Sequence, residues 1–346
     1  MSKSKSSTSA GLAFAPPRAP WGRVGLLVVI ALTVALLSLF NGSADLGAGH
    51  TLRALLGGAD VAARSIVIDL RLPRLLAGFA VGSLLALAGV LLQALFRNSL
   101  ADPYVLGVSG GAAVGAIIAM SLGAVMALVQ TAAVCGALVV MLGVYLLARG
   151  GSTGRLLLVG VAVASACGAL VSVLVAAADP ARLRGMVFWL AGDLEWATSP
   201  LASAVAALVC VAAAVLLARP LNVLAAGELR ARSVGLEWEK WRLAVYFATA
   251  IVTAIAVVSA GMIGFVGLIT PHTVRLLFRT SDHRIVAPLS ALLGGTLLAA
   301  ADLIARTAAS PRQLPVGAVT ALIGAPMFIV LLRSAARGAW NSGLKG

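Results

Sequence analysis

Ten apolar stretches, each long enough to cross a lipid bilayer, divide this chain of 346 residues. A helix needs about 20 mostly apolar residues to span the hydrocarbon core, where every backbone polar group must be bonded within the protein. The chain is therefore predicted to be an all-α polytopic membrane protein. The predicted helices cover 24–40, 75–96, 104–122, 125–148, 156–178, 200–218, 243–260, 262–278, 286–304 and 316–332.

The basic residues are distributed unequally between the two sides of these helices. With both termini in the cytoplasm, the cytoplasmic segments hold 18 basic and five acidic residues, a net charge of +13. The other side holds eight basic and seven acidic residues, a net charge of +1. Cytoplasmic loops carry the excess of Lys and Arg, so N- and C-termini are predicted to be cytoplasmic. Nucleic-acid binding is not expected, because the charges are dispersed and lack interleaved aromatic residues.

The composition also suggests the domain limits. Residues 1–22 are rich in Ser, Ala and Pro, which predicts a disordered cytoplasmic tail. Residues 23–335 form the predicted transmembrane domain, and residues 336–346 form a cytoplasmic C-terminal tail.

One segment, residues 219–242, departs from the apolar pattern with eight charged residues among 24. Gly227 and Gly235 would break it into short amphipathic turns, because glycine accepts backbone conformations that other residues avoid. Such turns would lie on the membrane surface and offer a docking site to a soluble partner. The alternative is a solvated loop that carries ordinary cytoplasmic positive charge.

The apolar helices contain almost no ionisable groups, which argues against ion-coupled transport. Proton- or sodium-coupled carriers need buried carboxylates, histidines or arginines as relays. The chain also lacks a Walker A sequence for binding ATP. These features favour a permease driven by a separate ATPase. An intramembrane enzyme would need converging polar residues, and a passive channel would need rings of polar residues along its pore. No catalytic residue, cofactor or metal site is predicted.

An internal repeat is suggested by two similar segments. The Ala-Gly pairs at 88–89 and 260–261 are each followed by an interrupted stretch that ends in a proline, Pro103 or Pro271. The second copy begins five helices after the first, so it would be inverted across the membrane.

Five motifs in order resemble the FecCD family of ABC importer permeases, and the resemblance covers roughly residues 24–335. They are RLPR (71–74), LLQALFRNSLADPYVLGVSGGA (91–112), LNVLAAGELRARSVGL (221–236), GMIGFVGLITPH (261–272) and LPVGAVTALIGAPMF (314–328).

The resemblance implies a type II ABC importer permease with about ten transmembrane helices, acting as a homodimer in the bacterial inner membrane. Its implied partners are two cytoplasmic ABC ATPase subunits and a periplasmic substrate-binding protein. The expected substrate is an iron complex, either a ferric siderophore or haem. Vitamin B12 (cobalamin) is the alternative within the same class, and a passive channel is the alternative from another class.

The resemblance assigns a docking role to three arginines predicted on the periplasmic side: Arg71, Arg74 and Arg306. Similar arginines in the family receive acidic residues of the binding protein, and such exposed charges steer docking. The alternative is that they are flanking residues whose side chains extend to the lipid headgroups.

The charged segment matches the coupling helices of the family, which rest in a cleft of the ATPase. The matching residues are Glu228, Arg230, Arg232 and Gly235.

Two further pairs are gate candidates. Ser152 and Thr153 fall where similar permeases narrow the cytoplasmic gate, although a flexible Gly-Gly-Ser-Thr-Gly turn explains them equally well. Phe188 and Trp189 belong to 179–198, which predicts a short amphipathic helix at the periplasmic mouth. These aromatic residues would line the gate or anchor the helix at the membrane interface.

Overall fold

The computed structural model describes residues 21–42, 46–58 and 61–343, and within these ranges the chain contains helices and turns but no strand. The prediction of an all-α protein is therefore confirmed. The main helices are α1 (Trp21–Phe40), α2 (Ala48–Leu55), α3 (Val61–Ser65), α4 (Leu72–Phe96), α5 (Val108–Ser121), α6 (Met126–Ala148), α7 (Thr153–Ala176), α8 (Pro180–Ala191), α9 (Pro200–Leu216), α10 (Ala218–Ala225), α11 (Glu228–Ser233), α12 (Trp238–Ala260), α13 (Val266–Phe278), α14 (His283–Thr307) and α15 (Val316–Gly343). A π-helical turn, η1 (Ile66–Arg71), joins α3 to α4, and the 3-10 turns are η2 (Pro103–Leu106) and η3 (Leu194–Trp196).

Helix extends into both predicted tails. α1 begins at Trp21, just before the predicted end of the N-terminal tail at residue 22, and α15 continues to Gly343, beyond the predicted limit at residue 335. Residues 1–20 of the predicted N-terminal tail lie outside the described residues.

Each of the ten predicted stretches overlaps a helix, but the helices differ in length. Six are long and apolar enough to cross a membrane: α1, the continuous run Val61–Phe96, α6, α7, α12 and α14. A seventh span would combine α9 and α10, which are bent by 67°. The remaining apolar helices, α5, α13 and Val316–Val330, are shorter. A multi-pass fold is clear, whereas ten complete spans remain a prediction.

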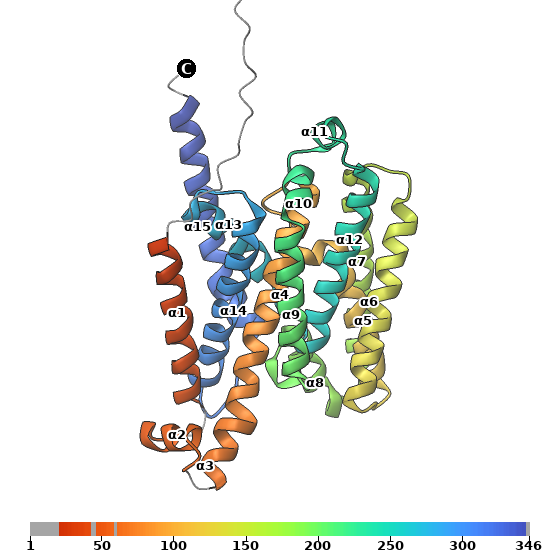
Figure 1. Cartoon of the computed structure of the whole chain (residues 1–346). Helices are drawn as coiled ribbons and strands as arrows, with labels where there is room; N and C mark the ends of the chain where they lie inside the picture. The colour runs from red at the N-terminus through yellow and green to blue at the C-terminus, as the bar shows by residue number, and fades with distance from the viewer. Residues whose placement is uncertain (1–20, 43–45, 59–60, 344–346) are drawn as a thin grey trace, which may run out of the picture.

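The centre of the bundle is α4, which packs against α14, α12, α9 and α13 (Figure 1). In the most apolar 18 residues of the run Val61–Phe96, 83% of the residues are buried inside the protein. In the corresponding part of α7, only 11% are buried. One apolar cluster joins α4 to α9 and α14, and another lies among α5, α6 and α12. The apolar surfaces of α1, α6 and α7 are largely exposed, which leaves them for lipid or for another subunit.

Glycines allow α4 to approach its neighbours at backbone distance. A Cβ atom on Gly89 would lie 1.8 Å from the carbonyl oxygen of Gly267 in α13, and one on Gly82 would lie 2.3 Å from that of Gly294 in α14. Small residues at helix crossings permit such contacts between membrane helices. The glycines of α4 therefore determine how closely the bundle packs.

The predicted repeat corresponds to two broken helical units. α4 is followed by η2 and α5, and α12 is followed by a short break and α13. Each break contains a glycine with positive φ, Gly107 at 76° and Gly261 at 70°. The breaks touch, because the Ile263 N–H donates to the Tyr104 hydroxyl oxygen at 2.6 Å. α4 and α12 run in opposite directions (Figure 1), as an inverted repeat requires.

The molecule has two distinct ends. The start of α1, the short helix α11 and the C-terminal part of α15 lie at one end, which we call the α11 end (Figure 1). The helices α2, α3 and α8 lie at the other end, which we call the α8 end.

The Gly89 contact can be tested by adding a single methyl group. We expect Gly89→Ala to lower the free energy of unfolding by about 1–3 kcal/mol or more, because the clash is with backbone that no rotamer change relieves. Unfolding of the purified protein in mixed micelles measures the change. Gly143→Ala is the matched control, since nothing lies within 4 Å of the added atom. Equal stability of both variants would contradict the proposed role of this crossing.

Candidate functional site

The charged segment forms a short helix held between two glycines, as predicted. α11 (Glu228–Ser233) follows Gly227, whose φ is 102°, and is followed by Gly235, whose φ is 78°. Both values lie in the left-handed region that glycine occupies without a steric penalty. α11 lies beyond the adjacent ends of α10 and α12, which precede and follow it in the chain (Figure 1).

One side of α11 packs inward and the other is free. Ala231 is fully buried, which fixes the orientation of the helix. The candidate residues Glu228, Arg230 and Arg232 are exposed, and Glu228 and Arg232 form an ion pair of 2.8 Å. Exposed ion pairs of this spacing contribute only about 0.3–0.5 kcal/mol to stability. Glu228 and Arg232 can therefore separate at little cost and pair with charged groups of a partner.

Leu229 lies on this free surface with 88% of its area exposed, and the sequence interpretation missed it. A leucine inside a segment rich in charges is the signal that identifies it. An exposed apolar side chain flanked by charges is suited to insert into a cleft of another protein.

Asn222 joins the α11 end of α10 to the start of α14. Its amide nitrogen donates to Asp282 Oδ1 at 2.9 Å, and its amide oxygen accepts from the backbone N–H of His283 at 2.9 Å. The same oxygen lies 2.6 Å from His283 Nδ1. These contacts tie α10, which leads into α11, directly to the start of the long helix α14.

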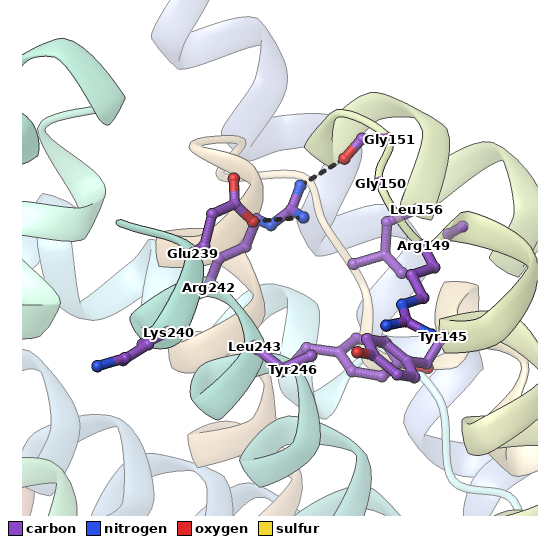
Figure 2. A pocket seen from close by; sticks show the side chains of 11 residues that line it. Tyr145, Arg149, Gly150, Gly151, Leu156, Glu239, Lys240, Arg242, Leu243 and Tyr246 are labelled. Carbon is purple, nitrogen blue, oxygen red and sulfur yellow. Dashed lines mark hydrogen bonds and ion pairs between the residues drawn. The ribbon is translucent and has the colours of Figure 1, made fainter. Parts of the chain in front are cut away.

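Arg242 joins the first turns of α12 to the loop between α6 and α7. Its Nη1 donates to the Gly151 carbonyl oxygen at 2.7 Å, and its Nη2 lies 2.7 Å from Glu239 Oε2 (Figure 2). The gate candidate Ser152 directly follows Gly151 and caps α7, accepting from the Arg155 N–H at 3.3 Å. Thr153 is the first residue of α7. The predicted gate loop is therefore tied to the helix that follows α11.

At the α8 end, four charged side chains form a buried network with no net charge. Arg74 lies 2.9 Å from Asp302 Oδ1 and 3.2 Å from Asp193 Oδ1. Arg306 lies 2.9 Å from Asp302 Oδ2 and donates to the Ser38 hydroxyl at 2.8 Å. The network connects α1, α4, α14 and the segment before η3.

Asp193 is held by backbone hydrogen bonds as well as by its ion pair with Arg74. Burial raises the pKa of its carboxyl group, while the Glu195 N–H and the Arg74 guanidinium act in the opposite direction. Its backbone N–H also donates to the Ala260 carbonyl oxygen at the end of α12.

The three docking arginines are not exposed in the way that the prediction assumed. Arg71 is 4% exposed and Arg306 is 5% exposed. Arg71 donates to the carbonyl oxygens of Leu39 and Phe40 at 2.7 and 3.1 Å, which satisfies backbone groups at the end of α1. Arg74 retains a side-chain exposure of 13%. All three arginines lie at the α8 end, where their side chains bond to other parts of the same chain. They therefore do not extend to the lipid headgroups, as the alternative interpretation assumed.

The two gate candidates in α8, Phe188 and Trp189, lie in different environments. Phe188 is half-buried beneath Arg184, whose Cζ lies 5.6 Å from the ring centroid, and it lines a cavity of about 540 Å³ with Glu195 and Gln313. Trp189 is 1% exposed and packs in the core, so interfacial anchoring is wrong for this residue.

Comparison with known proteins gives a consistent family match. Residues 28–334 match the FecCD transport family. The cobalamin import system permease protein BtuC of Halobacterium salinarum is 45% identical over 282 residues, which cover 80% of this chain and 75% of that protein. The vitamin B12 import system permease protein BtuC of Klebsiella pneumoniae is 39% identical over 320 residues, which cover 90% and 94%.

Solved structures resemble the fold as well. A metal-chelate type ABC transporter in an inward-facing conformation matches with a TM-score of 0.81 and 31% identity, covering 90% of this chain and 99% of that one. A complex of PsaBC from Streptococcus pneumoniae matches with a TM-score of 0.56 at 16% identity, over 78% and 93% of the two chains, which supports the fold alone.

Removing Asp302 tests whether the buried network holds the α8 end together. We expect Asp302→Ala to lower the free energy of unfolding by about 3–5 kcal/mol, because the buried guanidinium group of Arg306 and the largely buried one of Arg74 lose their shared carboxylate. Unfolding in mixed micelles measures the loss. Glu195→Gln, which removes an exposed charge beside the network, should change stability little. A stability of Asp302→Ala equal to that of the unmodified protein would show that the network is not structural.

Proposed function

Since the chain belongs to the FecCD transport family and is the permease component of an ABC importer, we propose that it carries cobalamin across the inner membrane. The chain is a transport component, and ATP is hydrolysed by a separate partner subunit. Cobalamin replaces the iron complex as the preferred substrate, because the relatives named for cobalamin or vitamin B12 import are 39–45% identical over most of the chain. This similarity is the observation that carries the proposal.

The free surface of α11 is the proposed contact with the ATPase. Leu229 inserts into a cleft of that partner, while Glu228, Arg230 and Arg232 surround it with charge. Gly235 ends the helix and lets the chain turn into α12. This places the α11 end in the cytoplasm, in agreement with the excess of basic residues in the segments assigned to that side.

Motion of α11 then reaches the rest of the permease through two side-chain contacts. Asn222 transmits it to α14, and Arg242 transmits it to the loop that holds Ser152 and Thr153. The loop narrows the cytoplasmic exit of the pathway when two copies of the chain assemble. The contacts support this proposal because α10 and α12, the helices on either side of α11 in the chain, are each bonded to a different part of the bundle.

The α8 end is the proposed docking surface for the substrate-binding protein. Arg74 retains 13% of its side-chain area and is bonded to Gln313, which lines the same cavity as Phe188. An acidic side chain of the binding protein would compete with Asp193 for this arginine. Arg71 and Arg306 support Arg74 from beneath by holding α1 in place.

Transport by the reconstituted complex tests the substrate. We expect vesicles that contain the permease, its ATPase and its binding protein to take up cobalamin in an ATP-dependent manner. Ferric siderophores and haem, supplied at the same concentration, should give little uptake. Radiolabelled substrate in the vesicles is the measurement, and vesicles with a non-hydrolysable ATP analogue are the control. Uptake of an iron complex without uptake of cobalamin would refute the assignment.

A charge placed on the free surface of α11 tests the ATPase contact. We expect Leu229→Asp to weaken binding of the ATPase subunit more than about tenfold, because the substitution places a charge where the proposed contact buries an apolar side chain, and the few residues that dominate an interface each contribute about 2 kcal/mol or more. Co-purification and light scattering measure the association.

Leu56→Asp is the matched control for this experiment. Leu56 is 78% exposed and directly follows α2, which lies at the α8 end (Figure 1), so its substitution should leave ATPase binding unchanged. Normal ATPase binding by Leu229→Asp would contradict the proposed contact and leave the family assignment unaffected.

A further inference from the structure

A cavity of about 490 Å³ lies at the α11 end, between the start of α12 and the loop that joins α6 to α7 (Figure 2). Its walls are mainly apolar or aromatic and include Tyr145, Leu156, Leu243 and Tyr246. Tyr246 is positioned by its hydroxyl group, which donates to the Met141 carbonyl oxygen at 2.8 Å. The volume is within the range of small-molecule sites, roughly 300–1,000 Å³.

The rim of the cavity carries one cation without a partner. Arg242 is paired with Glu239 and bonded to Gly151. Lys240 pairs with Glu237 and points away from the other lining side chains in Figure 2. The Arg149 guanidinium, by contrast, has no hydrogen-bond or ion-pair partner among residues 21–42, 46–58 and 61–343. The cavity therefore combines apolar walls with one available positive charge.

The height of the cavity along the helices identifies the environment that it meets. Arg149 follows α6, which ends at Ala148, and Arg242 lies in the second turn of α12, which begins at Trp238. Both helices are long and apolar enough to span a membrane. A bilayer that both helices span would place their ends, and the cavity between them, at the level of the lipid headgroups.

We propose that this cavity binds the headgroup region of an anionic phospholipid from the cytoplasmic leaflet. The lipid phosphate pairs with Arg149, and the first part of an acyl chain lies against Leu156 and Leu243. Basic pockets between transmembrane helices on the cytoplasmic side suit this class of ligand. A soluble anion would satisfy Arg149 but would leave the apolar walls uncovered, so the lipid fits the cavity better.

The proposal adds a ligand to the proposed importer but does not depend on its substrate. A bound lipid would contact α6, α7 and α12 together and would stabilise the loop that Arg242 holds. Binding should therefore raise the thermal stability of the complex.

The test uses the delipidated permease–ATPase complex in detergent, titrated with phosphatidylglycerol and followed by native mass spectrometry and thermal unfolding. We expect one tightly bound phosphatidylglycerol per permease chain and a higher melting temperature, with a much smaller effect of zwitterionic phosphatidylcholine. Arg149→Gln should weaken binding about fivefold, the effect of one basic residue near an anionic surface. Leu243→Trp should weaken it by filling the cavity while all charges remain.

Arg219→Gln is the matched control, because Arg219 is exposed on α10, near the same end, but does not line the cavity. Equal weakening by Arg149→Gln and Arg219→Gln would show that lipid responds only to general positive charge, and the proposed site would be wrong. Displacement of the lipid by millimolar inorganic phosphate would assign the site to a soluble anion instead. Cobalamin transport is measured separately, so its failure would not affect this result.

Discussion

The structure depends on a constraint that the bilayer imposes: wherever a helix is broken inside the membrane, other protein groups must satisfy the exposed backbone. The breaks after α4 and α12 are the main examples. The Ile263 N–H, in the break after α12, is satisfied by the Tyr104 hydroxyl oxygen. In the first turn of α13, which follows this break, the carbonyl oxygens of Gly267 and Leu268 accept from the amide nitrogen of Gln93 at 3.4 and 3.2 Å. Both contacts join one half of the repeat to the other. The first half therefore supplies side chains that satisfy the backbone of the second half. Close approach at Gly89 brings these groups within reach, because a larger residue in α4 would hold α13 away.

The same constraint explains why charges gather at the two ends and why the two ends differ. At the α8 end, Arg74, Asp193, Asp302 and Arg306 neutralise one another inside the protein. At the α11 end, the charged residues of α11 remain exposed and weakly paired. A buried ion pair loses much stability if one partner is removed, so the α8 end is rigid unless an incoming acidic group replaces one carboxylate. An exposed ion pair exchanges partners at little cost, which suits a surface that engages a second protein through repeated cycles.

Sequence reasoning reached the fold because the signals for it are local. Apolar runs locate the helices, and Gly227 and Gly235 delimit α11 within a charged segment. It could not place the arginines, because their partners are distant in sequence: Arg74 and Asp302 are separated by 228 positions. A flanking arginine looks exposed until its carboxylate is known. The prediction that Trp189 anchors its helix at the membrane interface was wrong for a similar reason. An aromatic residue in an amphipathic helix looks interfacial in the sequence when the residues that cover it come from other helices. The number of complete spans also stayed open, because α5 and α13 are short helices that begin at breaks inside the bundle.

The proposed coupling requires a small helix, α11, to act on a large bundle through its neighbours along the chain. α11 has only six residues and buries little beyond Ala231, so it cannot move the bundle through its own packing. Its neighbours along the chain provide the connection, since α10 bonds to α14 through Asn222 and α12 bonds to the α6–α7 loop through Arg242. One contact precedes α11 along the chain and the other follows it, so a tilt of α11 would act on both. Arg242 is bonded to Glu239 and Gly151, so among the described cations that line the cavity Arg149 is the one proposed to meet the lipid phosphate. In the functions proposed above, the loop between α6 and α7 is the place where the ATPase, through α12, and the lipid, through Arg149, would both act on the start of α7.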